Sequence, residues 1–457
     1  MTTWFADLAW LGGEGLASAV VLEGAGDGRL ARVASGQDPP AGAVHLTGIL
    51  VPGLANAHSH VFHRALRGRA QAGAGDFWRW RDRMYALAGV IDPDGLFALA
   101  RAAYAEMALA GITAVGEFHY LHHRPDGRAY PEANVMGEGL VAAAADAGVR
   151  LTLLDTCYLR PGFRGGSRLK GAQVRFADGD AERWVDRVEG LAVRVGSGWR
   201  LGAAVHSVRA VDERSMGVVA DWAARHGAPL HVHLSEQPAE NQEALAATGR
   251  TPTGLAEGSG VLGGRTTAIH ATHVTDEDIK ALGATGTGVC LCPSTERDLG
   301  DGVGPAARLV AAGCPLSLGS DSHAVVDLFE EARLVELHER LAHHRRSGHS
   351  ADALLEAATA GGYRALGWSS DGDGPAGMLT AGAPADFVAV DRASVRLAGL
   401  DPAEGAAALV FAATAADVTD VVVGGRMIVR DRRHVTIPDV AGDLHRAITS
   451  LWSRESP

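Results

Sequence analysis

Eight short apolar segments, separated by longer stretches with helical periodicity, most constrain the fold of this 457-residue chain. Between them, apolar residues recur every three to four positions, as in 96–111 and 212–227, which is typical of amphipathic helices. Eight such strands with intervening helices over roughly 300 residues predict an α/β chain with a (β/α)8 TIM barrel. The strand candidates are 53–60, 112–120, 150–159, 200–208, 229–236, 266–274, 287–295 and 315–323.

Both ends of the chain have a different, β-rich character. Residues 1–51 contain short strand patterns joined by Gly-rich turns, and strand patterns return after about Gly377. A helix is predicted at 440–452. We therefore expect a small composite β-sandwich domain built from 1–51 and 377–457, with the barrel at 52–376 between them. Two independent β modules are the alternative.

Composition excludes several classes of partner. The formal net charge of −12, without any Lys/Arg-rich run, argues against nucleic-acid binding. An anionic substrate would then need specific arginines that make a local positive pocket. No apolar run reaches the length of a membrane span, and the N-terminus lacks a basic region followed by an apolar stretch. The four cysteines lack zinc-finger spacing. We expect a cytoplasmic protein that binds neither nucleic acid nor membranes.

Histidines and carboxylates gather where the predicted strands end. In PGLANAHSH, His58 and His60 stand at i and i+2, so they share one face of a strand and can bind one metal ion. In a barrel enzyme the chemistry lies at the carboxyl ends of the strands. Six strands end in histidines or carboxylates, and together these residues predict a site. Besides His58 and His60, the polar residues at the predicted strand ends are Glu117, His119, Tyr120, His206, Arg209, His231, His233, Glu236, His270, His273, Ser320 and Asp321.

A zinc ion in a hydrolase takes imidazole and carboxylate ligands and keeps one position for water. Such ligands suit iron or manganese as well. His231 shares a strand face with His233 and is an alternative ligand, but only His233 is followed at i+3 by a carboxylate. The predicted ligands of a single ion are His58, His60, His233 and Asp321.

Proton transfer is assigned to residues beside these ligands. Glu236 lies three residues beyond His233, at the rim of the predicted site, where it is free to carry protons. His270, at the end of another strand, is the second proton carrier, and Asp321 acts with it on the attacking water. His273 is interpreted as a loop residue.

At this point the motifs resemble those of a known family. PGLANAHSH, HLSEQ, IHATH and LGSDSH resemble the amidohydrolase superfamily over almost the whole chain, and GAPADFVAVD and VVVGGRMIV resemble its composite β-domain. Two-metal members carry a carboxylated lysine at the end of strand four, and no lysine stands there in this chain. The resemblance therefore implies a one-metal deaminase.

A narrower resemblance lies outside the metal ligands. DFWRWRDRMY, TAVGEFHYLHH and AVHSVRAV resemble the formimidoylglutamate deiminases of bacterial histidine degradation. This resemblance implies conversion of N-formimino-L-glutamate and water to N-formyl-L-glutamate and ammonia, and it suggests a homodimer. The chain departs from the family pattern at His63, where better-known members carry glutamine; a neutral imidazole still donates or accepts one hydrogen bond.

Such a dicarboxylate substrate gives several residues a role. Arg209 can hold one carboxylate through two parallel hydrogen bonds, and His206 and Tyr120 can add further ones. Arg81 is the candidate contact for the second carboxylate, with an exposed arginine on a helix as the alternative. His63 would face the formimino end.

Two other functions stay open on sequence alone. Another mononuclear deaminase, acting on a guanine-, pterin- or triazine-like ring, would share the metal ligands but need aromatic and amide contacts in place of arginines. A barrel without activity could serve as a binding protein, although such proteins typically lack some ligands and this chain has all of them.

Overall fold

The computed structural model describes residues 2–71, 77–163, 168–196, 198–346, 348–369 and 374–454. Eight consecutive strands form a parallel sheet in sequence order. All eight strands expected from the sequence, and the barrel they imply, are confirmed. They are β5 (Leu54–Ser59), β6 (Ile112–His119), β7 (Arg150–Cys157), β8 (Trp199–Ser207), β9 (Leu230–Leu234), β10 (Thr266–His270), β11 (Gly288–Leu291) and β12 (Leu316–Leu318).

The barrel closes where β12 meets β5. Ser59 and Asp321 form a parallel bridge. The backbone N–H of Asp321 donates to the carbonyl of His58 at 3.0 Å, and the N–H of His60 donates to the carbonyl of Asp321 at 3.1 Å. A Cβ on Gly319 would lie 2.7 Å from the Cβ of His58, so only glycine allows this approach. The seam of the barrel thus lies among the predicted metal ligands.

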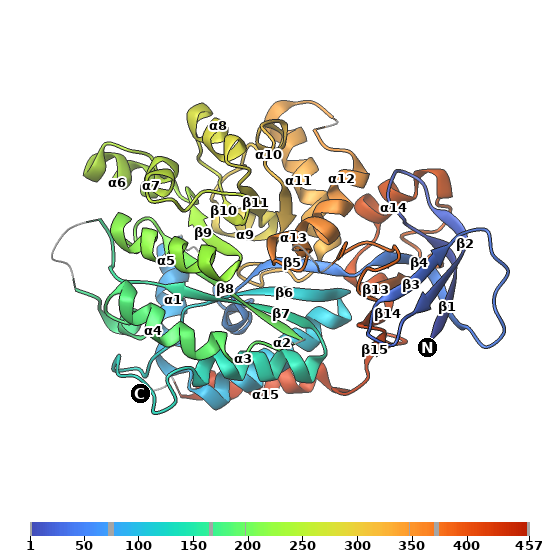
Figure 1. The fold of residues 1–457 in the computed structure, drawn as a ribbon, viewed down its shortest axis with the longest axis horizontal. Coiled ribbons are helices and arrows are strands. Elements are labelled where there is room, and N and C mark those ends of the chain that lie inside the picture. Colours follow the sequence, from blue (N-terminus) through green and yellow to red (C-terminus); the bar gives the residue numbers. More distant parts are fainter. Residues whose placement is uncertain are drawn as a thin grey trace.

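Helices surround the barrel (Figure 1). The helix that the sequence predicts over 212–227 is α5, which Asp212 caps by accepting from Ser215 N at 3.0 Å and which ends at Gly227. No helix in the described segments has the length and hydropathy needed to cross a membrane. The α-helices are α1 (Phe77–Val90), α2 (Pro93–Leu109), α3 (Val135–Ala147), α4 (Ala181–Ala192), α5 (Glu213–His226), α6 (Pro238–Thr248), α7 (Pro252–Gly258), α8 (Asp276–Ala284), α9 (Pro293–Leu299), α10 (Ala306–Ala311), α11 (Leu328–His343), α12 (Ala351–Glu356), α13 (Gly362–Ala365), α14 (Gly405–Ala412) and α15 (Val440–Ser453).

Both chain ends build a second sheet, at the right of Figure 1. Its order is β16-β15-β14-β13-β4-β1-β2-β3, so the strands form one continuous sheet. The two ends of the chain meet where β4 pairs parallel with β1 and antiparallel with β13. The composite β-domain is therefore confirmed. Its strands are β1 (Thr3–Ala9), β2 (Ala17–Gly24), β3 (Leu30–Ala34), β4 (Val44–Pro52), β13 (Phe387–Val390), β14 (Val418–Val423), β15 (Arg426–Arg430) and β16 (Arg433–His434).

The terminal helix α15 packs along α2 of the barrel. The indole N–H of Trp452 donates to the carbonyl of Ala65 at 2.9 Å, and Arg454 lies 2.8 Å from Asp92. The last helix therefore contacts the barrel, although it follows the second sheet in sequence.

One buried carboxylate joins the two sheets. Asp386, just before β13, accepts two hydrogen bonds from Arg150 at the start of β7, at 2.6 and 3.0 Å. It also accepts from the hydroxyl of Tyr363 and from the backbone N–H of Gly424, each at 2.7 Å. Its side chain is 1% exposed, so the charge depends on these partners for its stability.

We predict that Asp386→Ala lowers the free energy of unfolding by about 3–5 kcal/mol, because it leaves the Arg150 guanidinium without its buried partner. Urea denaturation measures the change. The matched control is Glu23→Ala, which breaks the exposed pair between Glu23 and Arg32 in the same sheet. It should cost at most about 1 kcal/mol. Equal losses in the two variants would contradict the role of Asp386.

Candidate active site

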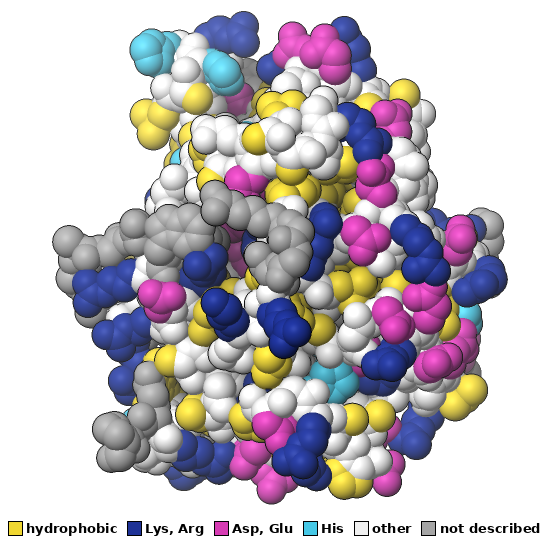
Figure 2. Space-filling view, turned by 90° about the vertical axis from the view of Figure 1, so that its left-hand side faces the viewer, with side chains coloured by type: hydrophobic (Ala, Val, Ile, Leu, Met, Phe, Trp, Pro, Cys, Tyr) yellow, Lys and Arg dark blue, Asp and Glu magenta, His cyan; other side chains and the backbone are white. Residues whose placement is uncertain are grey.

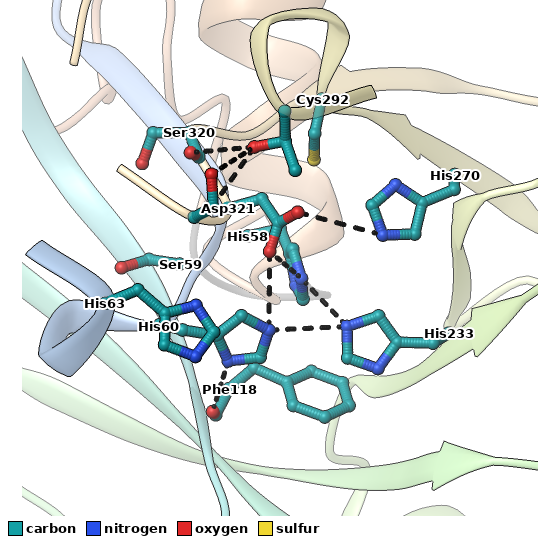
Figure 3. Close-up of polar contacts among 12 residues, drawn as sticks. His58, Ser59, His60, His63, Phe118, His233, His270, Cys292, Ser320 and Asp321 are labelled. Carbon is teal, nitrogen blue, oxygen red and sulfur yellow. Dashed lines mark hydrogen bonds and ion pairs between the residues drawn. The ribbon is translucent and has the colours of Figure 1, made fainter. Parts of the chain in front are cut away.

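Four predicted ligands converge at the carboxyl end of the barrel (Figure 3). The Nε2 atoms of His58 and His60 each lie 3.4 Å from Oδ1 of Asp321. Nε2 of His233 lies 3.1 Å from that of His58 and 3.3 Å from that of His60. All four side chains are buried, and one ligand atom from each lies within 4.8 Å of the other three. Strands β5, β9 and β12 thus direct their end residues at one point.

The hydrogen bonds of the imidazoles fix which nitrogens face that point. Nδ1 of His60 donates to the carbonyl of Phe118 at 3.0 Å, and Nδ1 of His233 donates to the carbonyl of His206 at 2.8 Å. A carbonyl only accepts, so these rings carry their proton on Nδ1 when neutral. Burial lowers the pKa of both imidazoles well below the ordinary value, which keeps them neutral.

Two neutral rings with this proton arrangement point lone pairs at each other across 3.3 Å. Lone pairs at that distance repel unless a cation lies between them. Burial raises the pKa of Asp321, but its contact with His58 outweighs this, and the pKa stands well below the ordinary value. Three imidazole nitrogens and one carboxylate, converging within 4.8 Å, therefore fit a divalent metal ion.

The structure favours His233 over His231 as a ligand. Nε2 of His231 donates to the carbonyl of Ala365 at 2.9 Å and is not among the converging ligand atoms of His58, His60 and Asp321. His273 is also held elsewhere, because its Nε2 donates to the carbonyl of Asp301 at 2.7 Å. Both residues therefore have structural hydrogen bonds outside the candidate metal site.

The two expected proton carriers lie next to the ligands. Nε2 of His270 is 3.8 Å from Glu236 and 3.9 Å from Asp321, and its Nδ1 is 3.3 Å from Glu296. Burial alone lowers the pKa of His270, but these three carboxylates raise it well above the ordinary value. Burial raises the pKa of Glu236, with His270 acting against it. His270 is thus suited to hold a positive charge.

Three strand ends of the site carry left-handed backbone at residues other than glycine. Ser235 has φ 51°, His270 has φ 69° and Asp321 has φ 40°. Such conformations cost about 1–3 kcal/mol each and persist only where the surrounding structure enforces them. Here they occur where the chain leaves β9, β10 and β12, and they direct His270 and Asp321 toward the centre.

A cavity of about 260 Å³ opens beside the ligands. Figure 2 shows the face of the molecule toward which the strand ends point, where acidic, basic and hydrophobic side chains lie close together. All five predicted substrate-binding residues line the cavity, and its wall also includes Tyr85, Tyr158 and Glu240. The predicted residues are His63, Arg81, Tyr120, His206 and Arg209.

Two of these predicted residues are already oriented. Nε2 of His63 lies 3.0 Å from the hydroxyl of Tyr120, so the histidine that replaces the expected glutamine belongs to the cavity wall. Arg81, on α1, lies 5.6 Å from the ring of Tyr85 and faces the cavity. This position in the cavity wall favours a ligand contact over the alternative of an exposed surface arginine.

Arg209 is the second cation of the cavity. Its guanidinium has no hydrogen-bond partner among the described residues. Burial lowers the pKa of Arg209, but Tyr158 and Glu240 outweigh it and the pKa is raised. A charged, unpaired donor in a cavity wall suits the carboxylate of a ligand.

Sequence reasoning missed two carboxylates. Glu296 contacts His270 and accepts from the backbone N–H of Cys292 at 2.9 Å, and Glu240 lines the cavity. Both stand in the first helical turn after a strand, on α9 and α6. Glu240 also stands four residues beyond Glu236, which lies just before α6, and this closeness in sequence was the available signal.

Comparison with known proteins agrees with the fold and the site. A model of the amidohydrolase family matches residues 49–428. The chain belongs to the amidohydrolase family. It is therefore a hydrolase, and the alternative of an inactive binding protein is not supported.

The relatives with similar sequences carry names that state different activities. The chain is 37% identical to a formimidoylglutamate deiminase of Pseudomonas aeruginosa, over 95% of this chain and 96% of that protein. It is 31% identical to an 8-oxoguanine deaminase of the same organism, over 84% and 82%. An amidohydrolase structure from Brucella melitensis superimposes with a TM-score of 0.90 at 33% identity, covering 99% of this chain and all of that one.

We predict that alanine at any of the four ligands strongly reduces metal content, because each supplies one of the converging donor atoms. Metal analysis by mass spectrometry on purified protein measures it. The control is His231→Ala, which removes a buried imidazole from the same strand face and should retain about one equivalent of metal. Full occupancy in His233→Ala, with loss in His231→Ala, would reverse the assignment. The four variants are His58→Ala, His60→Ala, His233→Ala and Asp321→Ala.

Proposed function

We propose that this amidohydrolase is a zinc-dependent deiminase, which hydrolyses N-formimino-L-glutamate to N-formyl-L-glutamate and ammonia in histidine degradation. The observation that carries the proposal is the cavity, which places two arginines, Arg81 and Arg209, beside the candidate metal ligands. The chain is acidic overall, so this pair of cations is a local feature suited to a dicarboxylate. The identity to a formimidoylglutamate deiminase over nearly the whole chain supports the same substrate.

The cavity residues divide between the two ends of this substrate. Arg209, after β8, offers a charged fork for one carboxylate, and Arg81, on α1, offers a second cation for the other. His206 and Tyr120 supply further hydrogen bonds to the substrate. His63, beside Tyr120 and within ring contact of His60, is placed for the formimino end.

The proposed chemistry assigns each nearby group one role. A zinc ion held by His58, His60, His233 and Asp321 would lower the pKa of water toward about 7 and supply a nucleophile. Asp321 and His270 would orient the attacking water, and Asp321, beside the charged His270, would accept the proton that the water loses. Glu236, whose pKa is raised by burial, would deliver one proton to the departing nitrogen, and Asp321 would return the second, so that ammonia leaves. The hydroxyl proton of the intermediate would then restore Glu236 as the carbonyl forms.

A second candidate is deamination of a purine-like ring, which the 31% identity to an 8-oxoguanine deaminase favours. Arginines on two walls of the cavity favour the dicarboxylate over a neutral ring. An ammonia-release assay on zinc-loaded protein compares N-formimino-L-glutamate with guanine, 8-oxoguanine and a pterin. We expect turnover of the first compound alone; faster release from a ring would support the second candidate.

A homodimer stays a prediction.

We predict that Glu236→Gln keeps its metal and lowers kcat by about 10²- to 10⁴-fold, because the amide is nearly isosteric and cannot transfer a proton. Steady-state kinetics and metal analysis on the same preparation measure the two effects. A loss below about tenfold would assign protonation of the leaving nitrogen to another group.

We predict that Arg209→Met lowers kcat/KM for N-formimino-L-glutamate by about 10- to 150-fold at unchanged metal content, because one carboxylate loses a charged partner. The control substrate is an N-alkyl formamidine, which has no carboxylate and whose slow hydrolysis should hardly change. An equal loss with both substrates would mean that Arg209 supports the architecture of the site.

A further inference from the structure

Glu240 is a buried carboxyl in the cavity wall to which the proposed reaction gives no role. It stands in the first turn of α6 and is 8% exposed. Its Oε1 is buried and has no hydrogen-bond partner. A buried carboxylate oxygen without a partner is costly, although the backbone N–H of Glu236 also acts on this carboxyl and favours its ionised form. A neutral carboxyl group costs much less to bury and also provides a donor.

The charged groups around Glu240 come from several elements. Arg209 follows β8, Glu236 follows β9 and His270 ends β10, and all three act on the Glu240 carboxyl. Arg81 on α1 and Glu243 on α6 line the same cavity. Burial raises the pKa of Glu240 to about 7, with Arg209 opposing the rise and Glu236 adding to it.

The bound substrate would change this balance. A substrate carboxylate held by Arg209 brings a further negative charge next to Glu240, which disfavours the ionised form. The protonated form would instead donate its O–H to the substrate carboxylate, a short and strong kind of hydrogen bond. Both effects favour the protonated form of Glu240 when the substrate is bound.

Resting on the proposed function, we propose that Glu240 is a specificity-determining residue that binds the substrate in its neutral form, donating a hydrogen bond to the carboxylate held by Arg209. The proton comes from solvent when Glu240 is ionised in the free enzyme. Binding of a dicarboxylate is therefore coupled to proton uptake, and the site selects an acid with three cavity groups, of which two are cationic and one is a neutral donor.

Titration calorimetry with N-formyl-L-glutamate on the zinc-loaded protein tests this coupling. In two buffers of different ionisation enthalpy at pH 8, the wild type should take up close to one proton per ligand. Above pH 7 its Kd should rise by about tenfold per pH unit, because the free carboxyl must first be protonated. This measurement needs no variant, and a wild type that takes up no proton overturns the proposal.

Glu240→Gln and Glu257→Gln provide the matched pair. The first keeps a neutral donor at every pH, so its Kd should stay flat from pH 6 to 9 and its proton uptake should be lost. Glu257, exposed on the neighbouring helix α7 and outside the cavity, is the control and should behave as the wild type. The formamidine without carboxylates should show no change in KM in either variant.

Three results separate the possible failures. If Glu240→Gln binds N-formyl-L-glutamate more tightly than the wild type even at pH 6, Glu240 is an ionised partner of Arg209 and the inference is overturned. If N-formimino-L-glutamate releases ammonia but Glu240→Gln keeps the wild-type pH dependence, the inference alone fails. If the dicarboxylate neither binds nor reacts, the proposed function fails together with it.

Discussion

Two neutral imidazoles, those of His60 and His233, aim their lone pairs at one point, where a nitrogen of His58 and an oxygen of Asp321 also lie, and a cation there removes the repulsion between them. The carbonyl groups of Phe118 and His206 fix the orientation of two of the rings, and Asp321 adds a negative charge between them. The closure of the barrel depends on the same residues, because Asp321 pairs with the backbone of His58 and His60. The fold and the candidate metal site are therefore parts of one structure, in which the last strand brings the carboxylate to the histidines of the first.

The arginines of the cavity, which suit a carboxylate, are separate from the candidate metal ligands. Its cations lie on α1 and on the loop after β8, outside the metal ligands, so a change of substrate needs only a change of these walls. Such a division fits a family whose members include both an 8-oxoguanine deaminase and a formimidoylglutamate deiminase. In this chain, an acidic protein retains two arginines in one cavity, which the carboxyl groups of Glu236 and Glu240 also line.

Much of this was predictable from local sequence patterns. Eight apolar runs predict the strands because each is buried on both faces, and the i, i+2 spacing of His58 and His60 predicts a shared face. The carboxylate of Glu236 at i+3 already favoured His233 over His231 in the sequence. The structure supports that choice, because Nε2 of His231 donates to the carbonyl of Ala365, which is distant in sequence. Glu296 and Asp386 were missed because their partners lie far away in sequence or on other elements, which no local period reveals.

The central claim is that this metal site hydrolyses a linear amidine bearing carboxylates. The most direct measurement follows N-formimino-L-glutamate labelled with ¹³C at the formimino carbon by NMR, with the zinc-loaded protein and with the same protein after chelation. The account predicts that the label appears in N-formyl-L-glutamate with one ammonia released per substrate, and that chelated protein shows no conversion until zinc is restored. Conversion at the same rate after chelation, or the absence of a formyl product from loaded protein, would contradict it.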